Sequence, residues 1–150
     1  MADIVSPRQR SKNMAAIHSA NTRPELFFRK LLFARGLRYR IHTRTVSGCP
    51  DIYLRKYNTA IFVNGCFWHR HSGCKFSYTP KSRVDFWVKK FSDNMKRDSH
   101  VKKDLAAAGI RQIIIWECTV KKMQKDECFR DTILETVIQF LTSDSQFLEL

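Results

Sequence analysis

The strongest constraint on the fold is a run of four large apolar residues, Ile113 to Trp116, in the last third of the chain. A short, continuous apolar run is typical of a strand that is covered on both faces of its sheet. The run follows a segment with helical periodicity that ends at Gly109, and another amphipathic segment comes after it. We therefore expect a strand over residues 110–117 within an α/β domain, with helices packed against the sheet.

The segments before this run predict one helix and three strands. Thr22-Arg23-Pro24-Glu25 is a capping box that begins a helix over residues 25–35, and Gly36 ends it. A short helix is also expected around residues 11–18. The alternation of polar and apolar residues predicts a β-meander of three strands, over 37–42, 51–54 and 59–64.

Two further helices complete the expected order of elements. Ser82 and Asp85 form a cap signature for a long helix toward Ala108, whose apolar stripe is expected to hold Val84, Val88, Phe91 and Met95. The last helix carries Phe129, Ile133, Val137 and Phe140. The pattern predicts one α/β domain over residues 1–150, built on a mixed sheet flanked by helices.

The charge of the chain points to a polyanionic partner. The chain has 27 Lys and Arg against 14 Asp and Glu, a net charge of +13. Residues 1–105 carry +15 and residues 106–150 carry −2. Such an excess usually answers nucleic acid or a membrane surface, and the asymmetry favours nucleic acid. Basic residues within 78–83 and 89–103 are candidate phosphate contacts.

Other protein classes fit the sequence poorly. It contains no apolar run of 18 residues, so we expect no transmembrane span, and the N-terminus lacks the apolar region of a secretory signal. Five cysteines are an odd number for a disulfide framework, which favours a reducing compartment and thiols that are free or bound to metal. Cys49 and Cys128 have no neighbouring ligand types and are expected to be core or free thiols.

The segment 65–81 is irregular and rich in zinc-type ligands. Cys66, His71 and Cys74 lie on one loop, and Cys118 follows the predicted buried strand. Thiolates and imidazole are the ligands of tetrahedral zinc sites, and four protein ligands leave no open position, which predicts a structural zinc. Gly73 allows the tight loop that such a cluster needs. Unlinked thiols and a surface histidine are the alternative.

Asp51 is a candidate ligand for a hard cation. It follows Gly48-Cys49-Pro50 at the start of a predicted strand, where a carboxylate can hold Mg²⁺ against a phosphate. Many nucleases add an acidic residue and a lysine on the next strand, but this chain has Phe62-Val63-Asn64 there. Backbone carbonyls can complete such a site, and an ordinary turn aspartate is the alternative.

The sequence Phe67-Trp68-His69-Arg70-His71 places two large aromatic residues beside basic residues on the same loop. Protruding aromatic rings can wedge between base pairs, although either ring, like that of Trp87, can instead pack inward. If His71 binds zinc, His69 is held in place and is a candidate general base, with a plain surface histidine as the alternative. The capping box is sufficient to explain Glu25.

Together these residues resemble the very-short-patch-repair (Vsr) endonuclease family, bacterial enzymes that nick DNA at thymine–guanine mismatches. The resemblance runs from about Arg10 to Cys118, and the segment Gly65-Cys66-Phe67-Trp68-His69 is its most specific part. The matching segments occur in the family's order: 10–14, 22–25, 48–51, 65–71, Cys74, Phe86-Trp87, Asn94 with Arg97-Asp98, and 115–118.

The resemblance implies a restriction-endonuclease-like fold and a Mg²⁺-dependent hydrolase that nicks the thymine strand of a T:G mismatch in duplex DNA. Such a nick starts very-short-patch repair of deaminated 5-methylcytosine. The implied protein is a monomer of the bacterial cytoplasm, associated with the nucleoid, with mismatch-repair proteins as partners. Residues 1–20 would form a DNA-contacting arm, and residues 65–81 a zinc and intercalation loop.

The resemblance also implies roles for single residues. Asp51 and the carbonyl of Val63 would bind Mg²⁺, and His69 would activate the attacking water. Glu25 would support this site from the N-terminal helix. The structural zinc would be held by Cys66, His71, Cys74 and Cys118. The intercalating side chains would be Phe67, Trp68, Trp87 and Met14.

The chain departs from the family pattern at Asn64, where members with a second active-site histidine carry it. Asparagine can hydrogen-bond a phosphate or a water but carries no proton at neutral pH, so Asn64 enters the candidate catalytic site with a different chemistry. Asn64 and the missing acidic residue and lysine also support an alternative, a non-catalytic zinc-stabilised DNA-binding module. Basic charge with aromatic residues supports a third, an RNA-binding protein.

Overall fold

The structure is a computed structural model that describes residues 6–15 and 20–150. One five-stranded mixed sheet has the order β1-β2-β3-β4-β5. The first three strands pair antiparallel, as the predicted meander requires, and β4 and β5 add to β3 in parallel. The strands are β1 (Arg40–Ile41), β2 (Ile52–Leu54), β3 (Thr59–Asn64), β4 (Arg111–Trp116) and β5 (Phe147–Glu149), with a 3-10 turn η1 (Arg55–Tyr57) between β2 and β3.

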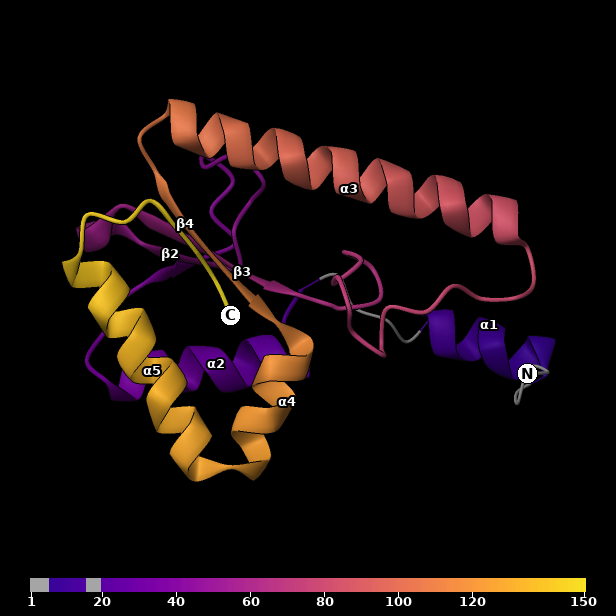
Figure 1. Ribbon diagram of the computed structural model, residues 1–150, viewed down its shortest axis with the longest axis horizontal. Coiled ribbons are helices and arrows are strands. Elements are labelled where there is room, and N and C mark those ends of the chain that lie inside the picture. The colour runs from indigo at the N-terminus through magenta and orange to yellow at the C-terminus, as the bar shows by residue number, and fades with distance from the viewer. Residues whose placement is uncertain (1–5, 16–19) are drawn as a thin grey trace.

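Helices cover both faces of this sheet (Figure 1). The long helix α3 (Val84–Ala107) crosses one face, and three helices lie on the other. These three are α2 (Arg23–Ala34), α4 (Glu117–Lys125) and α5 (Glu127–Thr142). The short helix α1 (Pro7–Ala15) lies at one end, beside the segment that leads into α3. The predicted mixed sheet flanked by helices is confirmed. No helix in the described parts of the chain is long and apolar enough to cross a membrane.

The apolar run Ile113 to Trp116 lies in strand β4, which is flanked by β3 and β5 in the sheet. Ile113 and Ile115 are fully buried and belong to the main core, which is shared with α2, α4 and α5. Ile114 points to the opposite face, because side chains alternate along a strand, and it lies half-buried near Val101 of α3. The prediction of a strand covered on both faces is therefore confirmed.

The long helix α3 buries a different face from the predicted one. Its buried residues are Trp87, Phe91, Asn94 and Leu105, whereas Val84, Val88 and Met95 of the predicted stripe are exposed. The first half of α3 packs against the irregular loop rather than the sheet, and there a hydrogen bond from Asn94 to the carbonyl of Trp68 takes the place of an apolar contact. Apolar periodicity could not anticipate a buried asparagine.

The predicted cap of α3 is also wrong. The helix follows Arg83, which has a φ of 53° and makes no side-chain cap bond. Ser82 instead accepts a hydrogen bond at 3.2 Å from Arg10 of α1. This contact ties the N-terminal helix to the start of α3. Of the predicted segment 11–18, residues 16–18 lie outside the described residues, as does part of the predicted arm 1–20.

Three other features differ from the sequence prediction. The strand expected over 37–42 is limited to β1, because Leu37 instead closes α2 by donating to the carbonyl of Leu32 at 3.1 Å. Helix α4 was not predicted; it begins directly at the end of β4, and Asp126 separates it from α5 by capping the Phe129 N–H. The short strand β5 also carries too few residues to show a period.

Candidate active site and metal centres

The parallel pairing of β3 with β4 assembles the cysteine–histidine cluster. Asn64 lies opposite Trp116 in this register, so Cys66 and Cys118 both stand two residues beyond the paired strand ends. Cys66 opens the irregular loop, and Cys118 lies in the first turn of α4. The Cys118 N–H donates to the Cys66 sulfur at 3.4 Å. The parallel pairing of β3 with β4 thus brings together two candidate ligands that are far apart in sequence.

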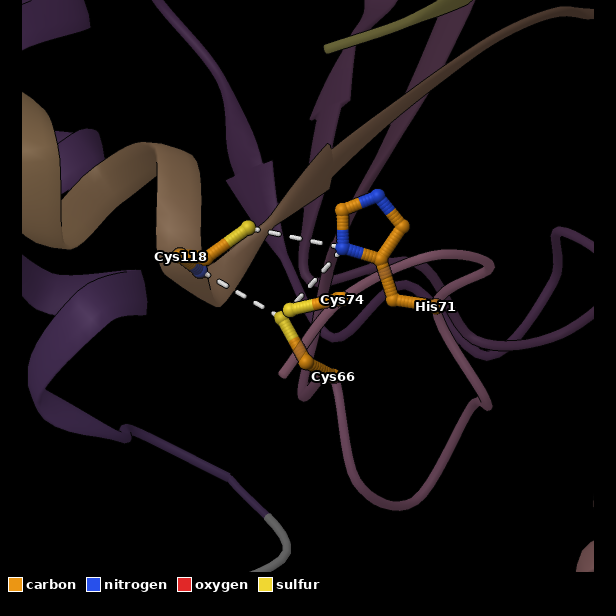
Figure 2. Close-up of side chains that lie close together, drawn as sticks. All are labelled: Cys66, His71, Cys74 and Cys118. Carbon is orange, nitrogen blue, oxygen red and sulfur yellow. Dashed lines mark hydrogen bonds between the residues drawn. The ribbon is translucent and has the colours of Figure 1, made fainter. Parts of the chain in front are cut away.

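The loop supplies the other two members of this cluster, His71 and Cys74 (Figure 2). The three sulfur atoms and the nearer ring nitrogen of His71 all lie within 4.8 Å of one another. That nitrogen, Nδ1, is 3.6 Å from the Cys66 sulfur and 3.4 Å from the Cys118 sulfur. The His71 ring stacks on Trp116, with centroids 4.2 Å apart, and is thereby fixed. Four such groups can surround one tetrahedral ion at bond lengths of about 2.0–2.3 Å.

The thiols of the cluster have to lose their protons before they can bind a cation. Cys66 is fully buried, and this burial raises its pKa to about 12. The thiolate is the form that binds metal, so a cation has to displace a proton that the buried site otherwise retains. The remaining thiols, Cys49 and Cys128, are exposed, and all five cysteines are free of disulfides. Cys49 and Cys128 thus take the free-thiol alternative that the sequence left open and not the core one.

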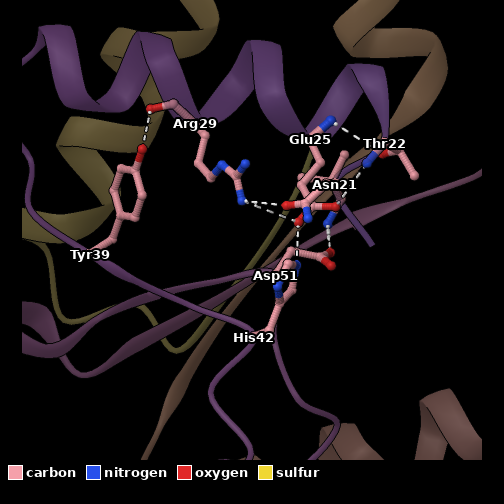
Figure 3. A network of polar contacts seen from close by, with 8 residues as sticks. Asn21, Thr22, Glu25, Arg29, Tyr39, His42 and Asp51 are labelled. Atoms are coloured by element: carbon pink, nitrogen blue, oxygen red, sulfur yellow. Dashed lines mark hydrogen bonds and ion pairs between the residues drawn. The ribbon is translucent and has the colours of Figure 1, made fainter. Parts of the chain in front are cut away.

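A second cluster, the carboxylate cluster, consists of Glu25, His42 and Asp51 (Figure 3). Asp51 precedes β2, and its Oδ2 accepts a hydrogen bond from the Val63 N–H at 2.7 Å. His42 directly follows β1 and donates its backbone N–H to the Asp51 carbonyl at 3.4 Å, so the two residues face each other across the β1–β2 pair. The ligand atoms of all three side chains lie within 4.8 Å of one another.

Glu25 serves both the helix and this cluster. Its N–H donates to Thr22 Oγ1 at 3.4 Å, and its Oε2 accepts from the Thr22 N–H at 3.3 Å, which confirms the predicted capping box. The other oxygen, Oε1, lies 2.6 Å from Nε2 of His42 and 3.8 Å from the Arg29 guanidinium. The capping box thus turns a carboxylate that is only 2% exposed toward Asp51.

Burial raises the pKa of Asp51 from its ordinary value of 3.8 to about 6. The hydrogen bond from Val63 opposes this rise, the charge of Glu25 adds to it, and His42 and His69 oppose it. Two neighbouring carboxylates that are held partly out of water disfavour each other's charge and therefore favour a cation between them. The carboxylate cluster can accordingly hold a metal ion.

His69 is anchored on the loop from two sides. Its N–H donates to the Gly65 carbonyl at 3.1 Å, and its Nδ1 lies 2.6 Å from Oδ2 of Asp98 on α3. A carboxylate only accepts hydrogen bonds, so the shared proton resides on Nδ1 and the other ring nitrogen of a neutral imidazole is left to accept a proton. The arrangement suits a general base.

The aromatic side chains form a cluster around Phe67. Its ring centroid lies between 5.1 and 5.4 Å from those of Trp68, Tyr78, Trp87 and Phe91. Phe67 and Trp68 are half-buried, whereas Trp87 is only 9% exposed. In this conformation Trp87 takes the inward-packed alternative that the sequence left open and supports Phe67 from inside the molecule.

A groove of about 920 Å³ is lined by six of the candidate residues. Its lining includes Met14, Val63, Asn64, Trp68, His69 and Trp87. A neighbouring cavity of about 580 Å³ shares Asn64, His69 and Arg97 with it and extends beneath α3. Asp51 lies just behind this lining, where it accepts a hydrogen bond from Val63. Residues predicted from four separate segments therefore border one concave surface.

Sequence reasoning missed two residues of this region, His42 and Asp98. No motif or spacing marks His42, whose position depends on the β1–β2 pairing and on the helix cap that faces it. Asp98 did carry a signal, because it belongs to the Arg97-Asp98 segment of the family resemblance, but its contact with His69 depends on how α3 crosses the loop.

A mixed sheet with a carboxylate at a strand start, an anchored histidine and a groove in a basic chain is the arrangement expected of a DNA-cutting hydrolase. The family model described as DNA mismatch endonuclease Vsr matches residues 2–75. The type II nicking enzyme V.NmeAIP of Neisseria meningitidis is 44% identical over 121 residues, which cover 81% of this chain and 86% of the relative.

Two other relatives match over a greater length. The type II nicking enzyme V.XorIIP of Xanthomonas oryzae pv. oryzae is 39% identical over 135 residues, with 90% of this chain and 98% of the relative covered. The DNA mismatch endonuclease Vsr of Escherichia coli is 35% identical over 139 residues, with 91% and 88% covered. The chain therefore belongs to the Vsr family of DNA mismatch endonucleases.

Family membership makes the chain a hydrolase of the endonuclease class, as the residue motifs predicted. It also decides between the alternatives that the sequence left open. A non-catalytic DNA-binding module and an RNA-binding protein both fit the charge and the aromatic residues. Neither accounts for relatives that are named as mismatch or nicking endonucleases and that match between 81% and 91% of this chain.

Proposed function

We propose that this chain recognises T:G mismatches in duplex DNA and hydrolyses one phosphodiester bond of the thymine strand, with Mg²⁺ as the catalytic cation. The nick would start very-short-patch repair of deaminated 5-methylcytosine in the bacterial cytoplasm, at the nucleoid. The chain would act as a monomer and pass the nicked DNA to mismatch-repair proteins. The observation that carries the proposal is the convergence of Asp51 and His69 beside a groove lined by Met14, Trp68 and Trp87.

Asp51 and the carbonyl of Val63 are the proposed Mg²⁺ ligands. The Val63 N–H points at Asp51, and within a strand the N–H and C=O of one residue face the same neighbour. The Val63 carbonyl is therefore turned toward the Asp51 side. Carboxylate and carbonyl oxygens are the hard ligands that Mg²⁺ takes. The bound cation would offset the charge that develops on the phosphate during attack.

His69 is the proposed general base. Asp98 keeps the proton on Nδ1, so Nε2 can take a proton from the attacking water as the water oxygen bonds to phosphorus and the ester oxygen leaves. Asn64 is buried at the end of β3 and lines the groove beside His69. Its amide can donate to a phosphate oxygen or orient the water. Glu25 supports Asp51 through their shared cluster.

Zn²⁺ is the proposed occupant of the cluster formed by Cys66, His71, Cys74 and Cys118. Three thiols and one imidazole form a soft ligand set that fills a tetrahedron. A zinc held in this way has no position for substrate, so its role would be to fix the loop 65–81. The same loop carries His69 and the aromatic residues Phe67 and Trp68. One ion would therefore hold the proposed general base and the proposed intercalating side chains in fixed positions relative to each other.

The aromatic residues are the proposed mismatch sensor. A mismatched pair costs less to unstack than a matched pair, so an enzyme that inserts side chains into the stack gains selectivity from the deformability of its substrate. Phe67 and Trp68 would insert, Trp87 would support Phe67, and Met14, which is 41% exposed on the groove lining, would enter from the other side. The positive charge would supply affinity without sequence preference.

A nicking assay on end-labelled duplexes tests the proposal. With Mg²⁺, zinc-loaded protein should nick the thymine strand of a T:G duplex roughly a hundredfold or more faster than a matched T:A duplex, because only the mismatch unstacks readily. Other mismatches and varied flanking sequences define the preferred context. Equal nicking of matched and mismatched duplexes would contradict the proposed specificity.

Asp51→Ala tests the assignment of the site in the same assay. The variant should still bind the T:G duplex but lose nicking, because binding uses basic and aromatic residues elsewhere. Asp144→Ala, at an exposed carboxylate of the C-terminal segment, is the matched control and should nick like the parent. If Asp51→Ala nicks as fast as the parent, Asp51 is not the metal ligand.

A further inference from the structure

We infer that His42 is a nitrogen ligand of the catalytic cation, so that the carboxylate cluster of Glu25, His42 and Asp51 binds Mn²⁺ more tightly than Mg²⁺. The inference rests on the proposed function in one respect, namely that Asp51 binds the cation. It adds an imidazole to a site for which the sequence indicated only oxygen ligands. His42 takes no part in the proposed reaction, although it is one of the three members of the cluster.

The geometry places one donor atom of each residue around a common point (Figure 3). Glu25 comes from the first turn of α2, His42 follows β1, and Asp51 precedes β2. Their ligand atoms lie within 4.8 Å of one another. Two ligands of one ion with bonds of about 2.1 Å stand about 3 Å apart when adjacent and about 4 Å apart when opposite. Small side-chain movements are enough to reach those separations.

Each carboxylate is held by one oxygen, which leaves the other for the cluster. Thr22 holds Oε2 of Glu25 in the capping box, so Oε1 faces His42. Val63 holds Oδ2 of Asp51, and no described part of the chain hydrogen-bonds Oδ1. Arg29 is also held, because it donates to Asn21 at 3.1 Å and so stays at the edge of the cluster, 3.8 Å from Glu25.

The ring nitrogen determines which ion the cluster prefers. Mg²⁺ takes oxygen ligands and retains water, whereas imidazole suits first-row transition-metal ions. Two carboxylates and a neutral imidazole also balance the charge of a divalent ion. Binding would replace the 2.6 Å hydrogen bond between Glu25 and His42 with two bonds to the ion. The proton that Nε2 shares with Glu25 would leave, and the ring would bind through Nε2 as the tautomer that carries its proton on Nδ1.

Pulsed electron paramagnetic resonance on the zinc-loaded, DNA-free protein tests the inference, because directly bound imidazole nitrogen modulates the Mn²⁺ echo. The parent should show this nitrogen modulation and bind Mn²⁺ at least about tenfold more tightly than Mg²⁺. His42→Gln, which keeps a hydrogen-bond donor toward Glu25, should lose the modulation. Its Mn²⁺ dissociation constant should rise by about tenfold or more, and its Mg²⁺ constant by less.

Two histidine controls make the result specific. His69→Gln and His100→Gln, the latter on the exposed surface of α3, should both keep the nitrogen modulation. Absence of modulation in the parent, or its persistence in folded His42→Gln, would overturn the inference and show that His42 only positions Glu25. The parent spectrum decides the point even if the variant does not fold.

Asp51→Asn separates the two proposals. If Asp51→Asn abolishes both Mn²⁺ binding and nicking while His42→Gln binds Mn²⁺ like the parent, only the role of His42 is overturned. If Asp51→Asn binds Mn²⁺ and nicks like the parent, the proposed site itself is wrong, and the inference fails with it.

Discussion

The two candidate metal-binding clusters of this chain differ in how many positions of an ion they can fill. Cys66, His71, Cys74 and Cys118 complete a tetrahedron of soft ligands, whereas Glu25, His42 and Asp51 supply three side chains to an ion that takes more. The first cluster leaves no place for substrate and the second does. Under the proposed function, the cysteine cluster would therefore have an architectural role and the carboxylate cluster a chemical one.

The clusters also differ in what holds their residues in place. The cysteine cluster depends on the register between two parallel strands, with Asn64 opposite Trp116, and on a loop without regular structure. The carboxylate cluster depends on a helix cap at Thr22 and on the antiparallel pairing of β1 with β2. Loss of the cysteine cluster should therefore release the loop, whereas loss of the carboxylate cluster should leave the fold intact.

The largest expected effect is on stability, from Cys118→Ser. Removal of one ligand should release the zinc and destabilise the chain by roughly 5 kcal/mol or more, because binding of a structural zinc is coupled to folding. A loss of that size is comparable to the whole stability of a small domain. Metal analysis with thermal unfolding measures it. Cys128→Ser, at an exposed thiol, is the control and should match the parent.

The opposite result for Cys118→Ser would remove the contrast between the clusters. If the variant keeps one zinc per chain and melts within a few degrees of the parent, the cysteine cluster is not an architectural site.

The next effect is on the rate of nicking, from Asp98→Asn. The amide can present a donor to Nδ1 of His69 and so favour the wrong tautomer, which should slow single-turnover nicking by about a thousandfold with unchanged DNA binding. Asp98 acts through His69, so the double variant with His69→Gln should be hardly slower than the slower single variant. If the losses of nicking rate in the two single variants multiply in the double variant, the two residues act independently.

A smaller effect concerns the pH dependence of stability. The pKa of Asp51 is about 6 in the folded chain against an ordinary 3.8, so the folded state binds this proton more tightly than the unfolded state. The sign follows from linkage: without a divalent cation at the carboxylate cluster, Asp51 should lower stability progressively as pH rises from about 4 to 6.

Asp51→Asn should remove that pH-dependent cost. The variant should be more stable than the parent above pH 6 by at most about 3 kcal/mol, and the difference should vanish toward pH 4. Urea unfolding of the zinc-loaded protein at several pH values measures it, with Asp144→Asn as the control. A variant that is less stable than the parent at pH 7.5 would show that the Asp51 carboxylate stabilises the fold.

The smallest effect is on mismatch recognition. Met14→Ala should weaken binding to a T:G duplex by about 1 kcal/mol, and Trp68→Ala by about 1–3 kcal/mol, because stacking on bases is lost. Binding to a matched duplex should change much less, since phosphate contacts dominate it. Fluorescence anisotropy with both duplexes measures the difference. Equal weakening on both duplexes would assign these side chains to general DNA binding.

The sequence predicted the parts of the fold that local chemistry determines. The apolar run Ile113 to Trp116 required a covered strand, and the capping box of Thr22 and Glu25 set the start of α2. The short strand β5 and helix α4 were not predicted. Their secondary structure depends on the sheet that they join and not on the periodicity of their own residues. The stripe of α3 was wrong because its first half packs on a loop through Asn94.

The two clusters were predictable to different degrees for a similar reason. Cysteine is uncommon and chemically specific, so Cys66, His71, Cys74 and Cys118 stood out as ligands before the register of β3 and β4 placed them together. His42 and Asp98 are ordinary residues in sequence, and only the β1–β2 pairing and the path of α3 give them partners. Residue type therefore predicted the architectural cluster better than the chemical one.

Anomalous X-ray diffraction from crystals of zinc-loaded protein soaked in Mn²⁺ tests the division between the two clusters most directly. We predict a zinc peak among Cys66, His71, Cys74 and Cys118, and a separate manganese peak among Glu25, His42 and Asp51. Manganese in the cysteine cluster, or no ion at Asp51 while the crystals nick T:G DNA when dissolved in the same Mn²⁺, would contradict the account.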